Sequence, residues 1–303
     1  MRLHLSPRPE GSPGLMELLA LSLAILSGVG HAVWNFLTKR SIDKEVFLWW
    51  MLFLRTVFLV PLFAIWAQGI SIPLVSLLCA TGSAVFYSIC VALMGRAYEG
   101  GDLSLVYPLS RSNPVYIPLW AALFLGERLS PLGLVGIAVT CLGVYTVGLE
   151  ALSLKAILSP IRSLNSRPSQ LALLAAVLAS IGACIDKVGV GSVWPFAYVF
   201  LFFVMMVVLY SAYILATKGG RAIGREWQTN WGNVLLGGFF GTSYVLTLLA
   251  MATSAVSYVI SARQVSVVVG TVLGVWLLKE RYGAIRIASS LLICVGVVMI
   301  GLA

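Results

Sequence analysis

Charged side chains are scarce in this sequence, because Asp, Glu, Lys and Arg make up 10% of its 303 residues while hydrophobic residues make up 60%. The mean hydropathy of +0.98 lies far outside the range of water-soluble globular proteins. The alternation of every second residue that is typical of membrane β-barrels is also missing, since the apolar stretches are nearly unbroken. We therefore expect an all-α integral membrane protein without a sizeable extramembrane domain.

Residues suited to metal or nucleophilic chemistry are also few. The sequence has 2 histidines, and its 5 cysteines fall inside apolar stretches without a C-x-x-C spacing or a nearby histidine. The 11 acidic residues lie mostly in loops, so we expect no enzyme, no metal and no cofactor. A net charge of +9 would suggest a nucleic-acid partner in a soluble chain. Here Lys and Arg lie mostly in short loops between apolar stretches, which indicates membrane topology and no nucleic acid.

A helix needs about 20 apolar residues to cross a bilayer core about 30 Å thick. The predicted spans lie at residues 15–38, 46–67, 74–95, 103–125, 131–149, 171–190, 194–216, 231–252, 255–278 and 283–302. These ten transmembrane helices form two sets of five, 15–149 and 171–303, with a polar tail at 1–14 and a polar linker at 150–170. The tail has no small-residue cleavage site, so we expect no cleaved signal peptide, and Met16 is an alternative start.

An internal repeat relates the two sets of five. Shifting the sequence by 153 positions pairs Glu127 with Glu280, Arg128 with Arg281, Cys141 with Cys294, and Gly143 with Gly296. Because five is odd, the second set enters the membrane from the opposite side, and the repeats are inverted. Inverted halves around a midplane site can expose that site to each side in turn, as secondary transporters do. Lys and Arg gather on the face that holds the linker, so we expect this face in the cytoplasm and both termini outside.

Three motifs stand out from the apolar background. They are Ala97 to Ser104, continuing through Tyr107, Pro108 and Arg111 to the stretch Gly126-Glu127-Arg128-Leu129-Ser130; the segment Ser261 to Ser266 leading to Leu278-Lys279-Glu280-Arg281; and His31-Ala32-Val33-Trp34-Asn35. Together they resemble the EamA-like family of the drug/metabolite transporter superfamily. The resemblance implies two inverted five-helix EamA repeats, secondary transport of small metabolites or drugs, and a central cavity lined by the first, third and fourth helices of each half. Gln264 departs from many relatives, which carry an acidic residue after the arginine.

Four basic side chains fall within the predicted spans or near their ends: Arg55, Arg111, Arg263 and Arg286. A charge at the bilayer centre costs at least about 2.5–3.5 kcal/mol, so one that is retained there usually faces a partner or a watery cavity. Arg111 and Arg263 each lie about nine residues into a span, close to the midplane. Two interpretations are open. The pair forms a clamp for a substrate carboxylate or phosphate, or it makes structural bonds to backbone carbonyls and neighbouring carboxylates.

Three prolines, Pro108, Pro114 and Pro118, surround Arg111. Each removes a backbone donor, so we expect a kinked or unwound segment, which a membrane tolerates only beside protein or water. A binding cavity is the preferred explanation, and a packing kink is the alternative. The predicted substrate-binding residues are Arg111, Arg263, Tyr107, Ser110, Asn113, Gln264, Tyr258, Trp34, Asn35 and Tyr244. For the aromatic residues among them, packing or lipid contact is the alternative role.

Three further residues are candidates for coupling transport to an ion. Asp186 is the best candidate for a proton-carrying carboxylate, with a solvated helix end as the alternative, and Lys187 adjoins it. His31 is suited to proton exchange, although a lone histidine inside a membrane is more often a structural hydrogen-bonding residue.

The sequence therefore predicts a multi-pass transporter of the cell membrane, an exporter or exchanger of a small anionic or zwitterionic metabolite that works by alternating access. The alternative is a proton-coupled cation or drug exporter that uses aromatic walls and Asp186. The expected partners are a small-molecule substrate, the lipid bilayer, and a coupling proton or a counter-substrate; no oligomeric state is implied.

Overall fold

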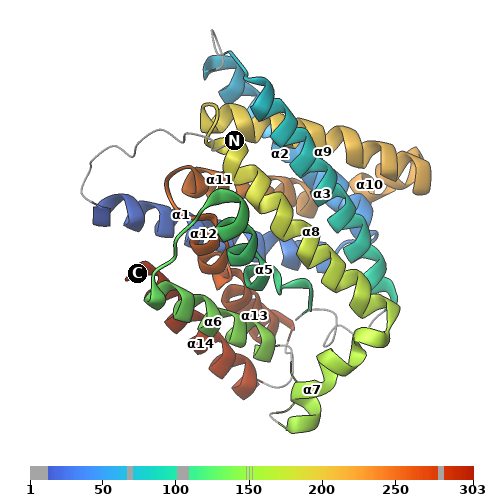
Figure 1. Cartoon of the computed structure of the whole chain (residues 1–303). Coiled ribbons are helices and arrows are strands. Elements are labelled where there is room, and N and C mark those ends of the chain that lie inside the picture. Colours follow the sequence, from blue (N-terminus) through green and yellow to red (C-terminus); the bar gives the residue numbers. More distant parts are fainter. Residues whose placement is uncertain are drawn as a thin grey trace.

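The computed structural model describes residues 13–66, 71–100, 109–147, 149, 151, 153–278 and 283–303. Throughout these residues the regular secondary structure is helical (Figure 1). Among the described residues, 8 helices are long and apolar enough to cross a membrane, and two shorter apolar helices lie at Asn113–Leu125 and Pro131–Val147. The prediction of an all-α membrane protein is therefore confirmed.

The first half of the chain supplies one set of helices and the linker supplies two short ones. The first set is α1 (Pro13–Lys39), α2 (Lys44–Trp66), α3 (Leu74–Gly100), α5 (Asn113–Trp120), the π-helical turn η1 (Ala121–Leu125) and α6 (Pro131–Val147). The linker forms α7 (Leu154–Arg162) and the 3₁₀ turn η2 (Ser163–Asn165). The Tyr145 hydroxyl donates to the carbonyl oxygen of Ile157 at 2.5 Å, which ties α7 to α6.

The second half repeats this order with more interruptions. Its helices are α8 (Arg167–Val190), α9 (Pro195–Thr217), α10 (Gly220–Gly241), α11 (Tyr244–Thr253), α12 (Val256–Ala262), α13 (Val265–Leu278) and α14 (Gly283–Gly301). The helix α10 begins earlier than the span predicted at 231–252, because the polar residues that precede residue 231 are also helical. Asn230 marks the junction with a non-helical φ of -135°.

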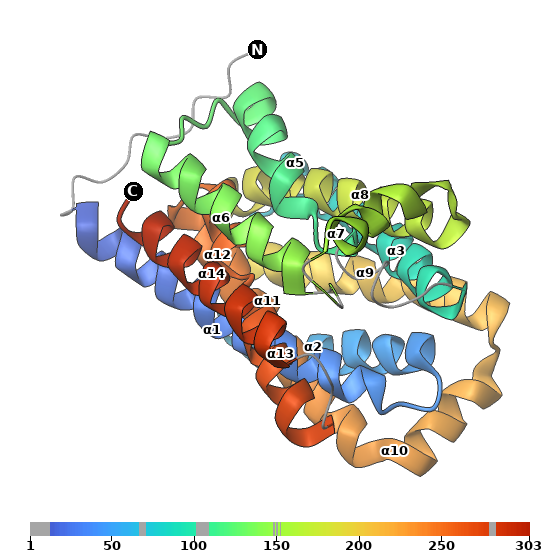
Figure 2. The same ribbon diagram turned by 90° about the horizontal axis from the view of Figure 1, so that it is seen from below.

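The loops alternate between two ends of the bundle, because consecutive spans run in opposite directions; α10 with α11, and α12 with α13, each form one span. We call one the terminal end, since α1 begins and α14 finishes there (Figure 2), and it holds the loops 126–130 and 191–194. We call the other the linker end, which holds α7 and the loops 40–43 and 218–219.

The contact between α6 and α14 follows the register of the repeat. The two helices lie side by side in both views (Figures 1 and 2). A Cβ atom on Gly143 would lie 2.8 Å from the carbonyl oxygen of Ser289, and one on Gly296 would lie 2.6 Å from the carbonyl oxygen of Gly136. Ser289 and Gly136 are themselves 153 positions apart. The interface is therefore self-complementary, as in a twofold symmetric dimer, and glycine allows the close approach.

Other helix contacts also occur in corresponding pairs, one from each repeat. The helix α2 packs on α10 as α9 packs on α3, while α2 and α9 pack on each other. The long contact of α3 with α8 has its counterpart in the contact of α1 with α10 and α11. These paired contacts surround α1, which carries part of the candidate site.

Candidate functional site

The imidazole of His31, in the middle of α1, is 8% exposed and lies between two arginines. Arg111 Nη1 is 2.6 Å from His31 Nε2, and Arg263 Nη2 is 2.8 Å from His31 Nδ1. The two arginines that the sequence places near the midplane thus meet at opposite nitrogens of one ring.

Both arginines occupy breaks in the helices that carry them. Arg111 lies in a turn directly before α5, and Arg263 lies in the turn between α12 and α13. The prolines around Arg111 predict its break, and the structure shows a turn there. A break frees backbone polar groups and aims side chains into the bundle, which is the usual construction of a midplane site in inverted-repeat transporters.

Aromatic rings support two of the buried guanidinium groups. The Arg263 guanidinium lies 5.1 Å from the centroid of the Tyr244 ring, and that of Arg55 lies 3.8 Å from the Phe203 ring. The rings of Phe203 and Tyr244 are themselves 6.4 Å apart. Within the described part of the chain, the Nε atoms of Arg55 and Arg263 are buried without a hydrogen-bond partner. Cation–π contacts hold both charges and leave one donor of each unused.

Asp186 on α8 is fully buried and contacts the hydroxyl group of Tyr244. Its Oδ1 accepts from the Tyr198 hydroxyl at 2.7 Å, and its Oδ2 accepts from the Tyr244 hydroxyl at 2.8 Å. The Tyr87 hydroxyl lies 2.9 Å from that of Tyr244. The carboxylate is therefore inside the bundle and not at a solvated helix end, and Tyr244 connects it to Arg263.

Two amides lie beside the breaks. Gln264, which is 5% exposed, donates from Nε2 to Asn113 Oδ1 at 3.4 Å. Its Oε1 atom is buried and has no hydrogen-bond partner in the described residues. Ser110, one residue before Arg111, is half-buried. The edge of Trp34 packs against the His31 ring with centroids 4.6 Å apart, so one side of the site is aromatic.

The remaining predicted site residues lie elsewhere or have other partners. Asn35 donates to the carbonyl oxygen of His31 on its own helix at 2.8 Å. Lys187 Nζ lies 2.5 Å from the Met251 carbonyl oxygen and 2.8 Å from that of Ser254, so it caps the end of α11. Tyr107 lies outside the described residues.

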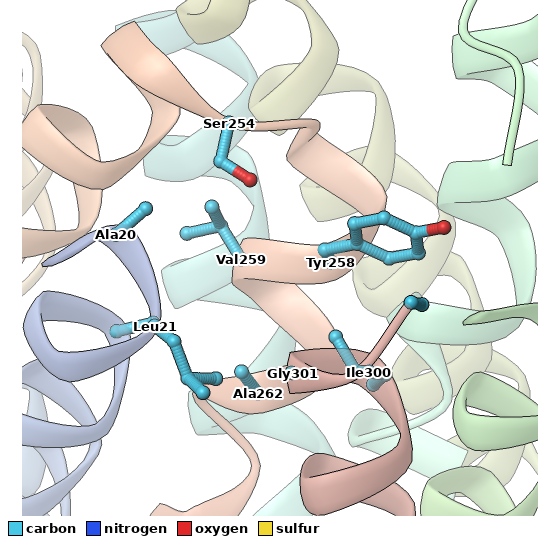
Figure 3. Close-up of a pocket in the computed structure, with 10 residues that line it drawn as sticks. Ala20, Leu21, Ser254, Tyr258, Val259, Ala262, Ile300 and Gly301 are labelled. Carbon is cyan, nitrogen blue, oxygen red and sulfur yellow. The ribbon is translucent and has the colours of Figure 1, made fainter. Parts of the chain in front are cut away.

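Tyr258 lies at the terminal end, away from the arginines. Its hydroxyl accepts from the backbone N–H of Ser130 at 3.0 Å. Its ring borders a cavity of about 40 Å³ between α1, α12 and α14, together with Ala20, Ser254 and Ile300 (Figure 3). This apolar cavity has room for little more than water and contains none of the buried cations.

Comparison with known proteins assigns the chain to a family. The model of the EamA-like transporter family matches it twice, at residues 18–149 and 168–302. The chain belongs to the EamA-like transporter family. Among solved structures, 28 chains match. One crystal structure covers 95% of this chain and 96% of its own, with a TM-score of 0.71 and 16% identity, and therefore shares the fold. No curated protein sequence matches.

Membership in this family makes the chain a multi-pass transporter of the cell membrane within the drug/metabolite transporter superfamily. Its environment is therefore the lipid bilayer and its substrate is a small molecule. Transporters of this class, unlike enzymes, need a site that binds and releases its ligand unchanged.

Polar contacts hold this transporter together at both ends of the bundle. At the terminal end, Gly126 adopts a left-handed φ of 67°, and the next residue, Glu127, accepts from the Val256 N–H at 2.7 Å. This carboxylate caps the start of α12. At the linker end, Lys218 Nζ lies 3.1 Å from Glu45 Oε2 and 3.3 Å from Asp43 Oδ2, which joins the start of α2 to the end of α9.

The sequence indicates Arg55 as a charge within a span but not as a part of the site, and it does not indicate Phe203 or Tyr198. Phe203 becomes relevant only because it lies under Arg55, and Tyr198 only because it donates to Asp186. Tyr198 is 12 residues from Asp186, on the next helix, so no helical spacing indicates the pair. A buried carboxylate in a span does require donors, and that requirement is the one signal in the sequence.

Proposed function

We propose that this protein is a secondary active transporter that exports or exchanges a small anionic or zwitterionic metabolite by alternating access. Ten transmembrane helices in two inverted five-helix repeats would provide the rocking halves. The symmetric contact of α6 with α14 supports this arrangement, as do the paired helix breaks at Arg111 and Arg263.

One observation carries the proposal: the guanidinium groups of Arg111 and Arg263 converge on a single point while Arg263 Nε remains unused. A buried donor without a partner is uncommon in native proteins, and this one lies at the point where the two guanidinium groups meet, so it is available to a ligand bound there. Arg263 forms no ion pair with a carboxylate among the described residues. A carboxylate or phosphate oxygen would satisfy these donors with charge-assisted hydrogen bonds.

The test is ligand-induced thermal stabilisation of the purified full chain. Anionic, zwitterionic and cationic metabolites are compared on the wild type and on Arg263→Gln, with Arg225→Gln as the matched control, because Arg225 is exposed in the first turns of α10. A ligand at 100 times its Kd stabilises the folded state by about 2.7 kcal/mol. We expect stabilisation by carboxylates or phosphates in the wild type and in the control, and its loss in Arg263→Gln.

A flux measurement then separates a carrier from a channel. In proteoliposomes, the ligand that stabilises the protein should show saturable uptake and counterflow. Flux that rises linearly with concentration and shows no counterflow would contradict alternating access.

The second candidate function is a proton-coupled cation or drug exporter. It is favoured by Asp186, a fully buried carboxylate that no described cationic side chain pairs with. Stabilisation by cations that persists in Arg263→Gln and disappears in Asp186→Asn would favour this function over anion transport.

A further inference from the structure

The imidazole of His31 lies between two groups that can only donate hydrogen bonds. A neutral imidazole has one N–H and one nitrogen lone pair, whereas a guanidinium has five donors and no acceptor. Arg111 approaches Nε2 at 2.6 Å and Arg263 approaches Nδ1 at 2.8 Å. In either neutral tautomer, one contact is a hydrogen bond and the other sets two N–H donors against each other. One of the two arginine contacts of the neutral ring is therefore not a hydrogen bond.

An oxyanion fits the same position without this conflict. The two nitrogens of an imidazole are about as far apart as the two oxygens of a carboxylate, and every carboxylate oxygen accepts hydrogen bonds. Both guanidinium groups could then donate at once. Arg263 Nε, buried and without a partner in the described chain, supplies a further donor. The His31 ring thus holds the place that an anion would take.

Charged and titratable groups surround this point, from helices packed against α1 and from α8 and the turn before α5. The nearest are Arg111 before α5, Arg263 after α12, Tyr244 on α11, Arg55 on α2, and Asp186 on α8 behind Tyr244. Most other titratable side chains on the helices packed against α1 lie toward the bundle ends: Lys44, Glu45, Arg221, Arg225, Glu226 and Arg286 at the linker end, and Tyr258 at the terminal end. Cys294, in the middle of α14, is exposed. The described residues of α13 include none.

Among the described residues, the surroundings of His31 are therefore positively charged, since two guanidinium groups touch the ring and the nearest described carboxylate, Asp186, already accepts from two tyrosines. Protonation of His31 would add a third positive charge beside the two arginines, and this is unfavourable unless an anion enters with the proton. Conversely, an anion that displaces the ring from the arginines can accept a hydrogen bond from a protonated imidazole.

We propose that the His31 imidazole lies between the two arginines until an oxyanion binds there, and that the ring then moves aside and takes up one proton. The inference rests on the proposed function and names the proton as the second transported species. The balance is one neutral imidazole plus one proton plus one anion, giving one imidazolium paired with the anion. The proton comes from water on the side where the anion enters, and it leaves with the anion on the other side.

Nitrogen NMR of the imidazole tests this directly, because the chain has 2 histidines and the other is His4. The His4→Gln protein, with ¹⁵N-labelled histidine, reports His31 alone and leaves the site intact. Spectra are recorded at constant pH without anion and with sulfate or succinate as the probe. We expect a neutral ring without anion and an imidazolium signal at saturating probe.

Titration calorimetry supplies the proton count. Binding of the same probe is measured in two buffers of equal pH and different ionisation enthalpy, for the wild type, His31→Gln and His31→Asn. If one proton is taken up per anion, the association constant of the anion falls by up to about tenfold for each unit by which the pH is raised. We expect this slope and about one proton taken up in the wild type, and neither in the two variants.

The outcomes separate the two proposals. If neither probe nor any anion of the metabolite panel binds, the proposed function fails and this inference fails with it. If an anion binds while His31 stays neutral and no proton is taken up, this inference alone is overturned. Because the NMR experiment leaves His31 in place, it decides the question even where the His31 variants fail to fold.

Discussion

The two repeats meet in two contrasting places, the α6–α14 interface and the arginine site around His31. At the interface the repeat is kept, because Gly143 faces Ser289 as Gly296 faces Gly136. Corresponding glycines from the two copies allow the helices to approach closely, and Ser289 Oγ donates across the interface to Thr146 Oγ1 at 2.8 Å.

At the arginine site the repeat is broken. The residues 153 positions from His31, Asp186, Tyr244 and Arg55 are Cys184, Val33, Val91 and Val208. Three of these are valines, which carry neither charge nor exchangeable side-chain proton, and the fourth is a thiol in place of the imidazole. The two copies thus share the packing, while the candidate chemistry lies where they have diverged, which places one imidazole and one carboxylate near the centre of a nearly symmetric scaffold.

The largest expected effect comes from breaking the symmetric interface. Gly143→Ala and Gly296→Ala each place a Cβ against a backbone carbonyl of the opposite helix. Overpacking of this kind costs about 3 kcal/mol at the upper end of its usual range, and both variants should be destabilised, Gly296→Ala more than Gly143→Ala because its Cβ would lie closer to the opposite helix. Thermal unfolding in detergent measures this. Gly82→Ala is the control, because nothing lies within 4 Å of its Cβ position. Destabilisation in only one of the two variants would contradict the symmetry.

The next largest effect is a difference in stability between two tyrosine variants, one at the candidate site and one in the packed core. Tyr244→Phe keeps the ring beside Arg263 and removes the hydroxyl that donates to Asp186. A buried charged acceptor that loses its donor costs about 2 kcal/mol. Tyr210→Phe is the matched control, since that hydroxyl is buried without a partner among the described residues. Equal melting temperatures for the two variants would show that the Asp186 contact adds no stability.

A smaller effect is expected where the scaffold positions the site. A Cβ on Gly28 would lie 2.8 Å from the Arg263 carbonyl oxygen and 3.2 Å from the Ser266 nitrogen. Gly28→Ala should therefore shift the turn that carries Arg263 and weaken sulfate binding about tenfold, or about 1.4 kcal/mol. Titration of sulfate into the variant and into Gly232→Ala, whose Cβ position is open, measures the difference. Unchanged affinity in Gly28→Ala would argue that Arg263 does not bind the anion.

The smallest effect concerns the linker end. Burial lowers the pKa of Lys218, but its hydrogen bonds with Glu45 and Asp43 outweigh this and raise the pKa above the ordinary value of 10.5. The stabilisation is therefore fully present at neutral pH and is lost only as the pH rises through the raised value. Lys218→Gln should cost less than about 1 kcal/mol, because the side chain is partly exposed. A melting-temperature difference from wild type that is already absent at pH 8 would contradict this sign.

The sequence predicts much of the fold, because the length and spacing of the apolar stretches are local properties. The break at Arg111 is predictable from its prolines, whereas the break at Arg263 is not, since residues 256–278 contain no proline. The linker helix α7 is missed because nine residues cannot be distinguished from a polar loop by hydropathy.

The candidate site is predictable only in part. A charge inside a span is conspicuous, so Arg111, Arg263 and Asp186 stand out in the sequence. Their common meeting point is not, because Arg111 and Arg263 are 80 and 232 residues from His31. The register also pairs Arg111 with Gln264, one residue away from Arg263. Tertiary packing, which the register does not specify, brings both guanidinium groups to the same ring.

The most direct test of the arginine site is anomalous diffraction from crystals grown with selenate, an oxyanion whose position can be located by its selenium atom. We expect a selenium peak between Arg111 and Arg263, within hydrogen-bond distance of both, with the His31 ring moved away from one or both arginines. A peak elsewhere, or both arginine contacts of His31 intact at a selenate concentration that raises the melting temperature, would contradict it.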